Sequence, residues 1–172
     1  EMERVGIVPK FVEGRRVTDE RVLEIAHKVL IDEISSKVVQ LIEEAGGKGV
    51  PLNGRGSNFL RCKKRLVDGF DLGFVGEVTA VDRELATRIC AGGVIPVVAP
   101  IARDVAGQLY NINADSVAWY VAACLGAEKL IFLSNVPGIL KDLKNPASIV
   151  SATTIRECRQ LMADGVIGGG MQ

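Results

Sequence analysis

Three polar side chains at alternate positions, Asn111, Asn113 and Asp115, stand directly before a strongly apolar segment. The two amides could bind a ligand carboxylate while the aspartate orients a cation. Asparagine and aspartate are also common helix N-caps, because their side chains accept backbone N–H bonds at the start of a helix. One cap needs only one such residue, so the spacing supports capping and ligand binding about equally.

A second group of candidate residues lies in the turn Asn135–Gly138, after an apolar run over residues 129–134 that predicts a buried strand. In open α/β sheets, ligands bind beyond the carboxyl ends of strands, where loops meet helix N-termini. The turn and the segment 111–115 both fit that position. The chain contains no P-loop, no complete G-x-G-x-x-G and no G-x-S-x-G motif. Its single histidine, His27, falls within a predicted helix.

The elements that would position these residues alternate between helices and strands. Apolar residues at three-and-four spacing predict one long helix over residues 19–45, which Thr18 or Asp19 can cap. The remaining patterns predict strands over residues 48–52, 59–66, 74–81, 94–99 and 129–134, and helices over 82–92, 115–125 and 154–164, the last opened by a capping box at Thr154 and Glu157. This alternation predicts a parallel sheet covered on both faces.

Three of these elements carry a further expectation. The strand over residues 94–99 is expected to be fully buried, because it is continuously apolar and β-branched. The basic run 61–65 is expected to be the solvated face of a hairpin rather than a binding site. The long helix would span roughly 40 Å, so part of its apolar face either meets a second copy of the chain or covers the core without a partner.

The composition excludes several classes of function. The 172 residues include 21 basic and 21 acidic side chains, and this zero net charge gives no general reason to expect nucleic acid or an anionic membrane as partner. No apolar stretch reaches the roughly 18 to 20 residues of a membrane span. The four cysteines are widely spaced, the sequence has no C-x-x-C motif and it contains a single histidine, so a cluster of metal ligands is not expected. These features predict a cytoplasmic protein with reduced thiols and no bound metal.

Four segments stand out in order along the chain: Phe11–Asp19, Asp71–Val78, Tyr110–Asp115 and Leu133–Leu140. The first is similar to the pattern F-v-n-G-x-R-V-T-D and the second to D-L-G-F-V-G-E-V. The third is similar to Y-N-I-N-A-D, and the fourth to L-[ST]-D-V-x-G-[IVL]-L with Asn135 in place of the usual aspartate. Together they resemble the motifs of the acetylglutamate kinases in the amino acid kinase family.

The resemblance implies a three-layer αβα sandwich with a mostly parallel central sheet. It also implies that residues 1–125 belong to an amino-acid-substrate lobe and residues 126–172 to a nucleotide-binding lobe. The activity implied is ATP-dependent phosphorylation of the side-chain carboxylate of N-acetyl-L-glutamate to an acyl phosphate, a step of arginine biosynthesis. The Mg²⁺ would be carried by the nucleotide, and a homodimer through the helix 19–45 is expected.

The resemblance also assigns roles to individual residues. Arg16, Asn111 and Asn113 would bind the substrate, and Asp115 would hold the catalytic lysines in place. The nucleotide pocket would be lined by Asn135, Val136, Pro137, Gly138, Ile139, Leu140, Val166, Ile167 and Gly168. A planar guanidinium suits a bidentate carboxylate contact, although without the motif Arg16 reads as a surface arginine beside Arg15.

Two lysines and a glycine-rich loop of the family have no counterpart in the 172 residues. The chain is therefore expected to be the central part of an enzyme, with a sheet incomplete at both termini, and to be inactive by itself. Two alternatives stay open. One is a non-catalytic acetylglutamate-binding or regulatory homologue, and the other is an amino acid kinase that acts on glutamate, aspartate, carbamate or UMP.

Overall fold

The computed structural model describes residues 1–12, 16–53, 56–66, 71–134, 136, 138–142 and 144–167, together with the backbone of Arg15. The chain divides into two compact units. The first comprises Glu1–Val12 and Arg16–Leu130, and the second comprises Glu13–Arg15 and Ile131–Gln172. Each unit is described by itself.

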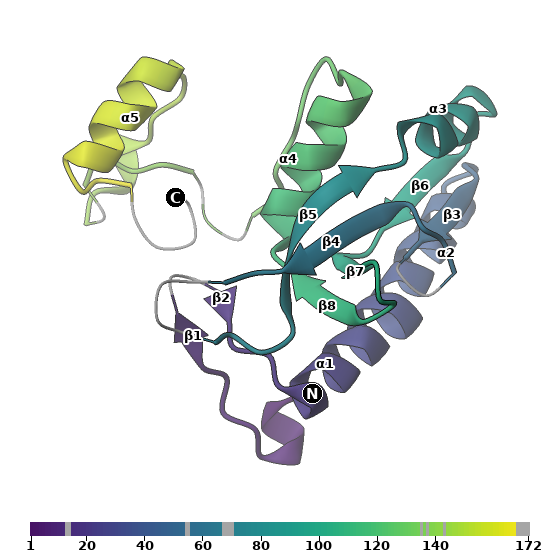
Figure 1. Ribbon diagram of the computed structural model, residues 1–172. Coiled ribbons are helices and arrows are strands. Elements are labelled where there is room, and N and C mark those ends of the chain that lie inside the picture. Colours follow the sequence, from purple (N-terminus) through teal and green to yellow (C-terminus); the bar gives the residue numbers. More distant parts are fainter. Residues whose placement is uncertain are drawn as a thin grey trace. The chain divides into compact units, whose positions relative to one another are not determined.

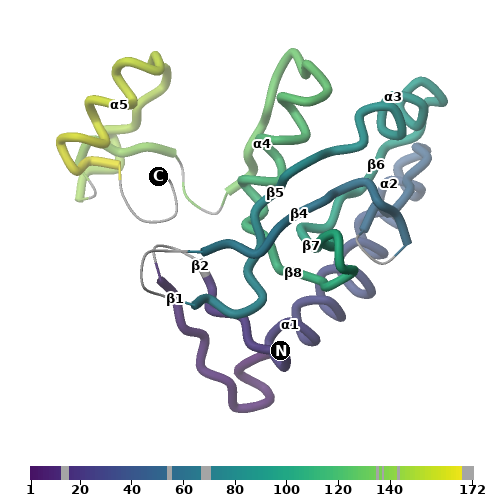
Figure 2. The backbone as a smooth tube through the Cα atoms, in the orientation of Figure 1, coloured from purple at the N-terminus to yellow at the C-terminus, as the bar shows by residue number. Residues whose placement is uncertain are grey.

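One long helical rod forms the edge of the first unit, which confirms the helix predicted over residues 19–45. It consists of α1 (Glu20–His27), a π-helical segment (Lys28–Ser35) and α2 (Ser36–Glu44), and Figure 2 shows them as one continuous coil. The Asp19 carboxylate accepts a hydrogen bond from the Val22 backbone N–H at 2.8 Å and so caps the rod. In the π-helical segment, the buried Ser35 hydroxyl donates to the Leu30 carbonyl at 2.8 Å.

The strands of the first unit pair in both orientations. β3 (Gly49–Leu52) and β6 (Ile95–Val98) form a parallel pair. β4 (Leu60–Lys64), β5 (Val75–Val81), β8 (Leu109–Ile112) and β7 (Ile101–Arg103) follow one another in a ladder that closes on itself. A separate two-stranded sheet joins β1 (Phe11–Val12) and β2 (Arg15–Arg16).

The mixed α/β class is confirmed, and antiparallel pairs accompany the parallel ones that the sequence predicts. In the closed ladder, β5 pairs with β8 and β4 with β7 in parallel, whereas β4 pairs with β5 and β7 with β8 in antiparallel fashion. The connections within the two antiparallel pairs are too short for the crossover that parallel neighbours require. Chain length between strands therefore decides their orientation here.

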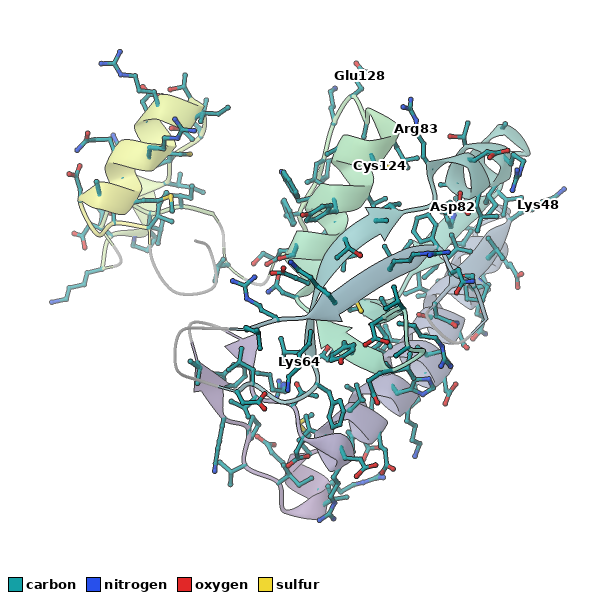
Figure 3. All side chains as sticks on the ribbon, in the orientation of Figure 1. Lys48, Lys64, Asp82, Arg83, Cys124 and Glu128 are labelled. Atoms are coloured by element: carbon teal, nitrogen blue, oxygen red, sulfur yellow. The ribbon has the colours of Figure 1, made fainter. Side chains whose placement is uncertain are left out.

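Helices cover the strands of the first unit. α2 packs against β3, α3 (Arg83–Ala91) against β6, and α4 (Ala114–Leu125) against β5 (Figure 1). Asp82 caps α3, as predicted, by accepting from the Leu85 N–H at 2.9 Å, and it lies beside Arg83 at the start of that helix (Figure 3). The core between these elements contains the largest fully buried side chains, Phe59, Leu72 and Ile101.

Two predictions about strands are wrong. Ile95 in β6 is 49% exposed, so this strand is not fully buried. Residues 129–134 form no strand, and Leu133 is 95% exposed. A strand exists only where another strand satisfies its backbone groups, and none of the described strands pairs with this run. Its apolar composition alone therefore does not make it a strand.

Three cations of the basic run 61–65 pair with two acidic neighbours, which agrees with the predicted solvated face. The Lys63 ammonium lies 2.8 Å from the Glu77 carboxylate, and the Arg65 guanidinium lies 3.2 Å from the same group. Lys64, labelled in Figure 3, pairs with Asp71 at 2.9 Å. These cations are engaged within their own hairpin.

The second unit contains η3, a 3-10 helix (Pro146–Ser148), and α5 (Ile155–Ala163). The capping box predicted for α5 is confirmed. The Glu157 N–H donates to the Thr154 hydroxyl at 3.2 Å, and the Thr154 N–H donates to the Glu157 carboxylate at 2.7 Å. This second bond holds the pKa of Glu157 below its ordinary value.

The four cysteines are free thiols in the structure. Cys62 is buried in the core, and burial raises the pKa of its thiol to about 12. Cys90 is exposed, while Cys124 and Cys158 are half-buried. The thiol of Cys62 is therefore protonated at neutral pH and packs as an apolar group.

Candidate functional site

Three backbone segments cross at one point in the first unit. The Thr18 N–H donates to the Leu72 carbonyl at 2.9 Å, and the Phe74 N–H donates to the Thr18 carbonyl at 2.7 Å. The Asn111 N–H then donates to the Phe74 carbonyl at 2.9 Å. This series joins the segment after β2, the segment before β5 and strand β8, so it holds Arg16 and Asn111 near one another.

Gly73 lies at the centre of this crossing and is required there for two reasons. Its φ of +73° is in the left-handed region that side chains disfavour. A Cβ at this position would also collide with the Thr18 carbonyl oxygen and would lie 3.0 Å from the Thr18 carbonyl carbon. Glycine therefore permits the close approach of the two segments.

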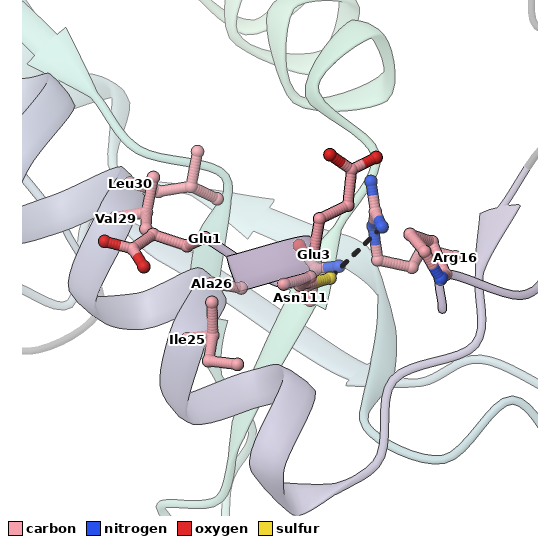
Figure 4. Close-up of a pocket in the computed structure, with 10 residues that line it drawn as sticks. Glu1, Glu3, Arg16, Ile25, Ala26, Val29, Leu30 and Asn111 are labelled. Atoms are coloured by element: carbon pink, nitrogen blue, oxygen red, sulfur yellow. Dashed lines mark hydrogen bonds between the residues drawn. The ribbon is translucent and has the colours of Figure 1, made fainter. Parts of the chain in front are cut away.

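Arg16 and Asn111 line the same cavity, which has a volume of about 340 Å³ (Figure 4). One wall is apolar and comes from the helical rod, with side chains Ile25, Ala26, Val29 and Leu30. The N-terminal segment supplies another part of the lining. The cavity thus joins a cation, an amide and an apolar wall, which suits a small anion that also carries apolar atoms.

Among the described residues, the Arg16 guanidinium contacts only weakly interacting groups, an aromatic ring and a thioether sulfur. Its carbon lies 4.8 Å from the centroid of the Phe11 ring, and Nη1 donates to the Met2 sulfur at 3.2 Å. A thioether is a weak acceptor. A ligand carboxylate would therefore replace this contact with a stronger, charge-assisted one.

The charge of the cavity is mixed. Arg16 is the one cationic side chain among the ten residues that line it, whereas Glu1 and Glu3 contribute carboxylates. Glu1 is paired with Arg4 at 2.9 Å. Like charges repel, so an anionic group of a ligand is favoured at Arg16 and Asn111 rather than beside these acids.

Thr18 is a member of this site that the sequence analysis did not identify as functional. Its side chain is fully buried, its hydroxyl donates to the Arg16 carbonyl at 2.9 Å, and it accepts from Asn111 Nδ2 at 3.3 Å. From its sequence position, Thr18 was predicted only as an alternative to Asp19 for capping the helix. Since one cap suffices, the second polar residue at this helix start was a signal of another role.

The two other predicted residues of the 111–115 segment do not line this cavity. Asn113 caps α4, because its Oδ1 accepts from the Ser116 N–H at 2.9 Å and from the Ser116 hydroxyl at 3.1 Å. The capping alternative thus holds for Asn113, and its Nδ2 is the group left for a ligand. Asp115 is exposed in the first turn of α4, where the helix dipole favours a carboxylate.

The predicted nucleotide residues belong to the second unit. Val136 and Gly138 are exposed, Ile139, Leu140 and Val166 are half-buried, and Ile167 is buried. Leu140 bridges Ile149, and the Val166 and Ile167 N–H groups both donate to the Leu161 carbonyl. Asn135, Pro137 and Gly168 lie outside the described residues.

The second unit has a cavity of about 210 Å³ close to these segments along the chain. Lys141, Thr153 and Glu157 are among its lining residues, and the predicted nucleotide residues are not. The role of the predicted nucleotide residues stays a prediction.

Within the described part of the chain, no group of three or more histidine, cysteine, aspartate or glutamate side chains could hold a metal ion. No helix there is long and apolar enough to cross a membrane.

Several known proteins are similar to this chain. The acetylglutamate kinase of Thermosynechococcus vestitus is 42% identical over 99% of this chain and 57% of its own length. That of Synechococcus sp. (strain JA-2-3B'a(2-13)) is 44% identical over 99% of this chain and 54% of its own length. The chain therefore spans a little over half the length of these relatives.

Two solved structures are similar to this chain in fold. The crystal structure of smu.665 from Streptococcus mutans UA159 aligns with a TM-score of 0.85 and 26% identity, covering 99% of this chain and 67% of the other. N-acetylglutamate synthase from Neisseria gonorrhoeae, complexed with coenzyme A and N-acetyl-glutamate, aligns with a TM-score of 0.72 and 25% identity, covering 94% of this chain and 36% of that chain.

The pattern of the amino acid kinase family matches the whole chain, residues 1–172. The relatives and the solved structures agree with this match, and the first three motif segments lie in or beside the strands β1, β2, β5 and β8. The chain belongs to the amino acid kinase family.

Proposed function

We propose that the protein transfers the γ-phosphoryl group of ATP to the side-chain carboxylate of N-acetyl-L-glutamate. The observation that carries this proposal is the cavity that Arg16 and Asn111 both line. The part of its wall that comes from the helical rod is apolar and contains no carboxylate. Arg16 and Asn111 would bind the α-carboxylate, and the apolar wall would contact the methylene and acetyl groups. Its acetylglutamate kinase relatives support the same substrate.

The proposed reaction requires few catalytic groups from the residues of this chain. A carboxylate with a pKa near ~4.3 is already ionised at neutral pH, so the reaction requires no general base. Phosphoryl transfer depends mainly on positioning and on neutralising negative charge, and Mg²⁺ bound to the triphosphate supplies part of that neutralisation. In this proposal Asp115 orients cationic side chains at the reacting phosphate, and the second unit contributes to the nucleotide site.

Trapping of the acyl phosphate tests this function. The protein, expressed from its full reading frame, is incubated with ATP, Mg²⁺ and hydroxylamine, which converts an acyl phosphate to a hydroxamate that forms a coloured complex with added Fe³⁺. We expect hydroxamate with N-acetyl-L-glutamate and at least tenfold less with L-glutamate or L-aspartate. Equal or greater product from an unacetylated amino acid would contradict the proposed substrate.

A non-catalytic role in binding acetylglutamate is the second candidate. The similar synthase from Neisseria gonorrhoeae carries the same fold under a different activity, so the fold alone does not establish phosphoryl transfer. Binding of N-acetyl-L-glutamate in calorimetry, without hydroxamate from any acceptor, would favour this candidate over the kinase.

We also propose that two copies of the chain associate through the helical rod. Three apolar side chains, Ile34, Val38 and Leu41, are 48%, 37% and 50% exposed, and their spacing of four and three residues puts them on one stripe. Leu41→Asp is expected to shift the sedimenting species from dimer to monomer, whereas Gln40→Asp, one residue away and exposed, leaves it unchanged. A monomeric wild-type protein at micromolar concentration would contradict the dimer.

A further inference from the structure

We propose that Thr18 is a positioning residue that determines the orientation of the Asn111 side-chain amide. Through this orientation the cavity selects ligands that carry an N–H group next to a carboxylate. This inference rests on the proposed function, because it concerns how the same cavity recognises an N-acylated amino acid. It adds a residue, Thr18, whose hydroxyl links the backbone carbonyl of Arg16 to the side chain of Asn111.

The first step is an account of the Thr18 hydroxyl proton. A hydroxyl group has one proton to donate and lone pairs with which to accept. The Arg16 carbonyl can only accept, and it lies 2.9 Å from Thr18 Oγ1, so the single proton is directed to it. What the hydroxyl offers to any other neighbour is therefore a lone pair.

The second step concerns the Asn111 amide. Its Nδ2 lies 3.3 Å from Thr18 Oγ1 and donates to that lone pair. If the amide were reversed, its oxygen would face the hydroxyl oxygen with no proton between them, and two lone pairs would repel. Because Thr18 is fully buried, water cannot supply the missing proton. The hydroxyl therefore selects one of the two amide orientations.

The third step follows the other side of the amide. With Nδ2 committed to Thr18, Asn111 has an acceptor, Oδ1, and one remaining N–H for a ligand in the cavity that it lines. Beside it, the Arg16 guanidinium supplies further donors. This wall presents donors for a carboxylate and, next to them, an acceptor for an N–H.

An N-acyl amino acid matches this pattern, because its carboxylate and its amide N–H are attached to the same carbon. The ester isostere 2-acetoxyglutarate has the same shape and charge but carries an oxygen where the amide has N–H. That oxygen would face Asn111 Oδ1 without a proton, so the ester should bind more weakly. The ratio of the two dissociation constants thus reports the orientation of Asn111.

The experiment measures this ratio by calorimetry in wild type, Thr18→Val and Thr18→Ser. Valine keeps the shape of threonine without the hydroxyl, and serine keeps the hydroxyl. We expect wild type and Thr18→Ser to prefer N-acetyl-L-glutamate over the ester about tenfold or more, and Thr18→Val to prefer it less than about threefold. A purely structural role would weaken both ligands equally, so an unchanged ratio in folded Thr18→Val would overturn the proposal.

A measurement on the free wild-type protein covers the case in which Thr18→Val does not fold. We expect a nuclear Overhauser contact between an Asn111 Nδ2 proton and the Thr18 side chain, and its absence from assigned spectra would overturn the proposed orientation. If wild type bound neither ligand, the proposed function would fail, while this contact would still decide the role of Thr18.

Discussion

Replacing Arg16 by alanine is expected to weaken the binding of N-acetyl-L-glutamate by about 10- to 100-fold. The substitution removes a charge-assisted hydrogen bond worth roughly 1.5 to 3 kcal/mol, which corresponds to that change in dissociation constant. Among the described residues, the guanidinium of the free protein contacts the Phe11 ring and the Met2 sulfur. The loss should therefore appear in ligand binding and much less in the free energy of unfolding.

Calorimetry with N-acetyl-L-glutamate checks this prediction. Arg16→Lys retains the charge but not the planar fork of donors, so it should give an intermediate loss. Arg83→Ala is the matched control, since Arg83 is exposed at the start of α3 and lies outside the cavity. An unchanged dissociation constant for Arg16→Ala would remove the main residue of the proposed site.

Replacing Gly73 by alanine is expected to lower the free energy of unfolding by roughly 2 to 5 kcal/mol. About 1 to 2 kcal/mol comes from placing a side chain at a left-handed φ, and about 1 to 3 kcal/mol comes from the steric conflict with the Thr18 backbone. Relief of that conflict has to separate the segments that hold Arg16 and Asn111. Ligand affinity should therefore fall together with stability.

Urea denaturation of Gly73→Ala and Gly93→Ala measures the two contributions separately. Gly93 has a φ of +70°, close to the +73° of Gly73, but an added Cβ there meets no atom within 4 Å. Gly93→Ala should therefore lose only the left-handed penalty and should leave ligand binding unchanged. Equal losses in the two variants would show that the Thr18–Gly73 approach has no energetic importance.

The elements that sequence analysis predicted correctly depend on neighbouring residues. The rod over residues 20–44, the cap at Asp82 and the capping box at Thr154 are all formed by bonds between residues a few positions apart. Their signals are therefore present in short stretches of sequence. The same applies to Asn113, because helix capping was one of the two roles that its position in the sequence predicted.

The features that were not predicted correctly from the sequence depend on residues far apart in the chain. Whether residues 129–134 form a strand depends on a pairing partner, which composition does not specify. Thr18 and Asn111 are 93 positions apart, so their contact leaves no local pattern. The resemblance to a family predicted that Arg16 and Asn111 bind the same substrate. The structure shows that the backbone segments around Gly73 are hydrogen-bonded to one another, which explains how the two residues come to line one cavity.

A double-substitution cycle on Arg16 and Asn111 tests the central claim most directly, namely that both side chains hold one ligand. The dissociation constant of N-acetyl-L-glutamate is measured for wild type, Arg16→Ala, Asn111→Ala and the double variant. If both groups contact the same carboxylate, the double variant should lose less than the sum of the single losses, by at least about 1 kcal/mol. Losses that add to within about 0.5 kcal/mol would show that the two side chains act independently and would contradict the shared site.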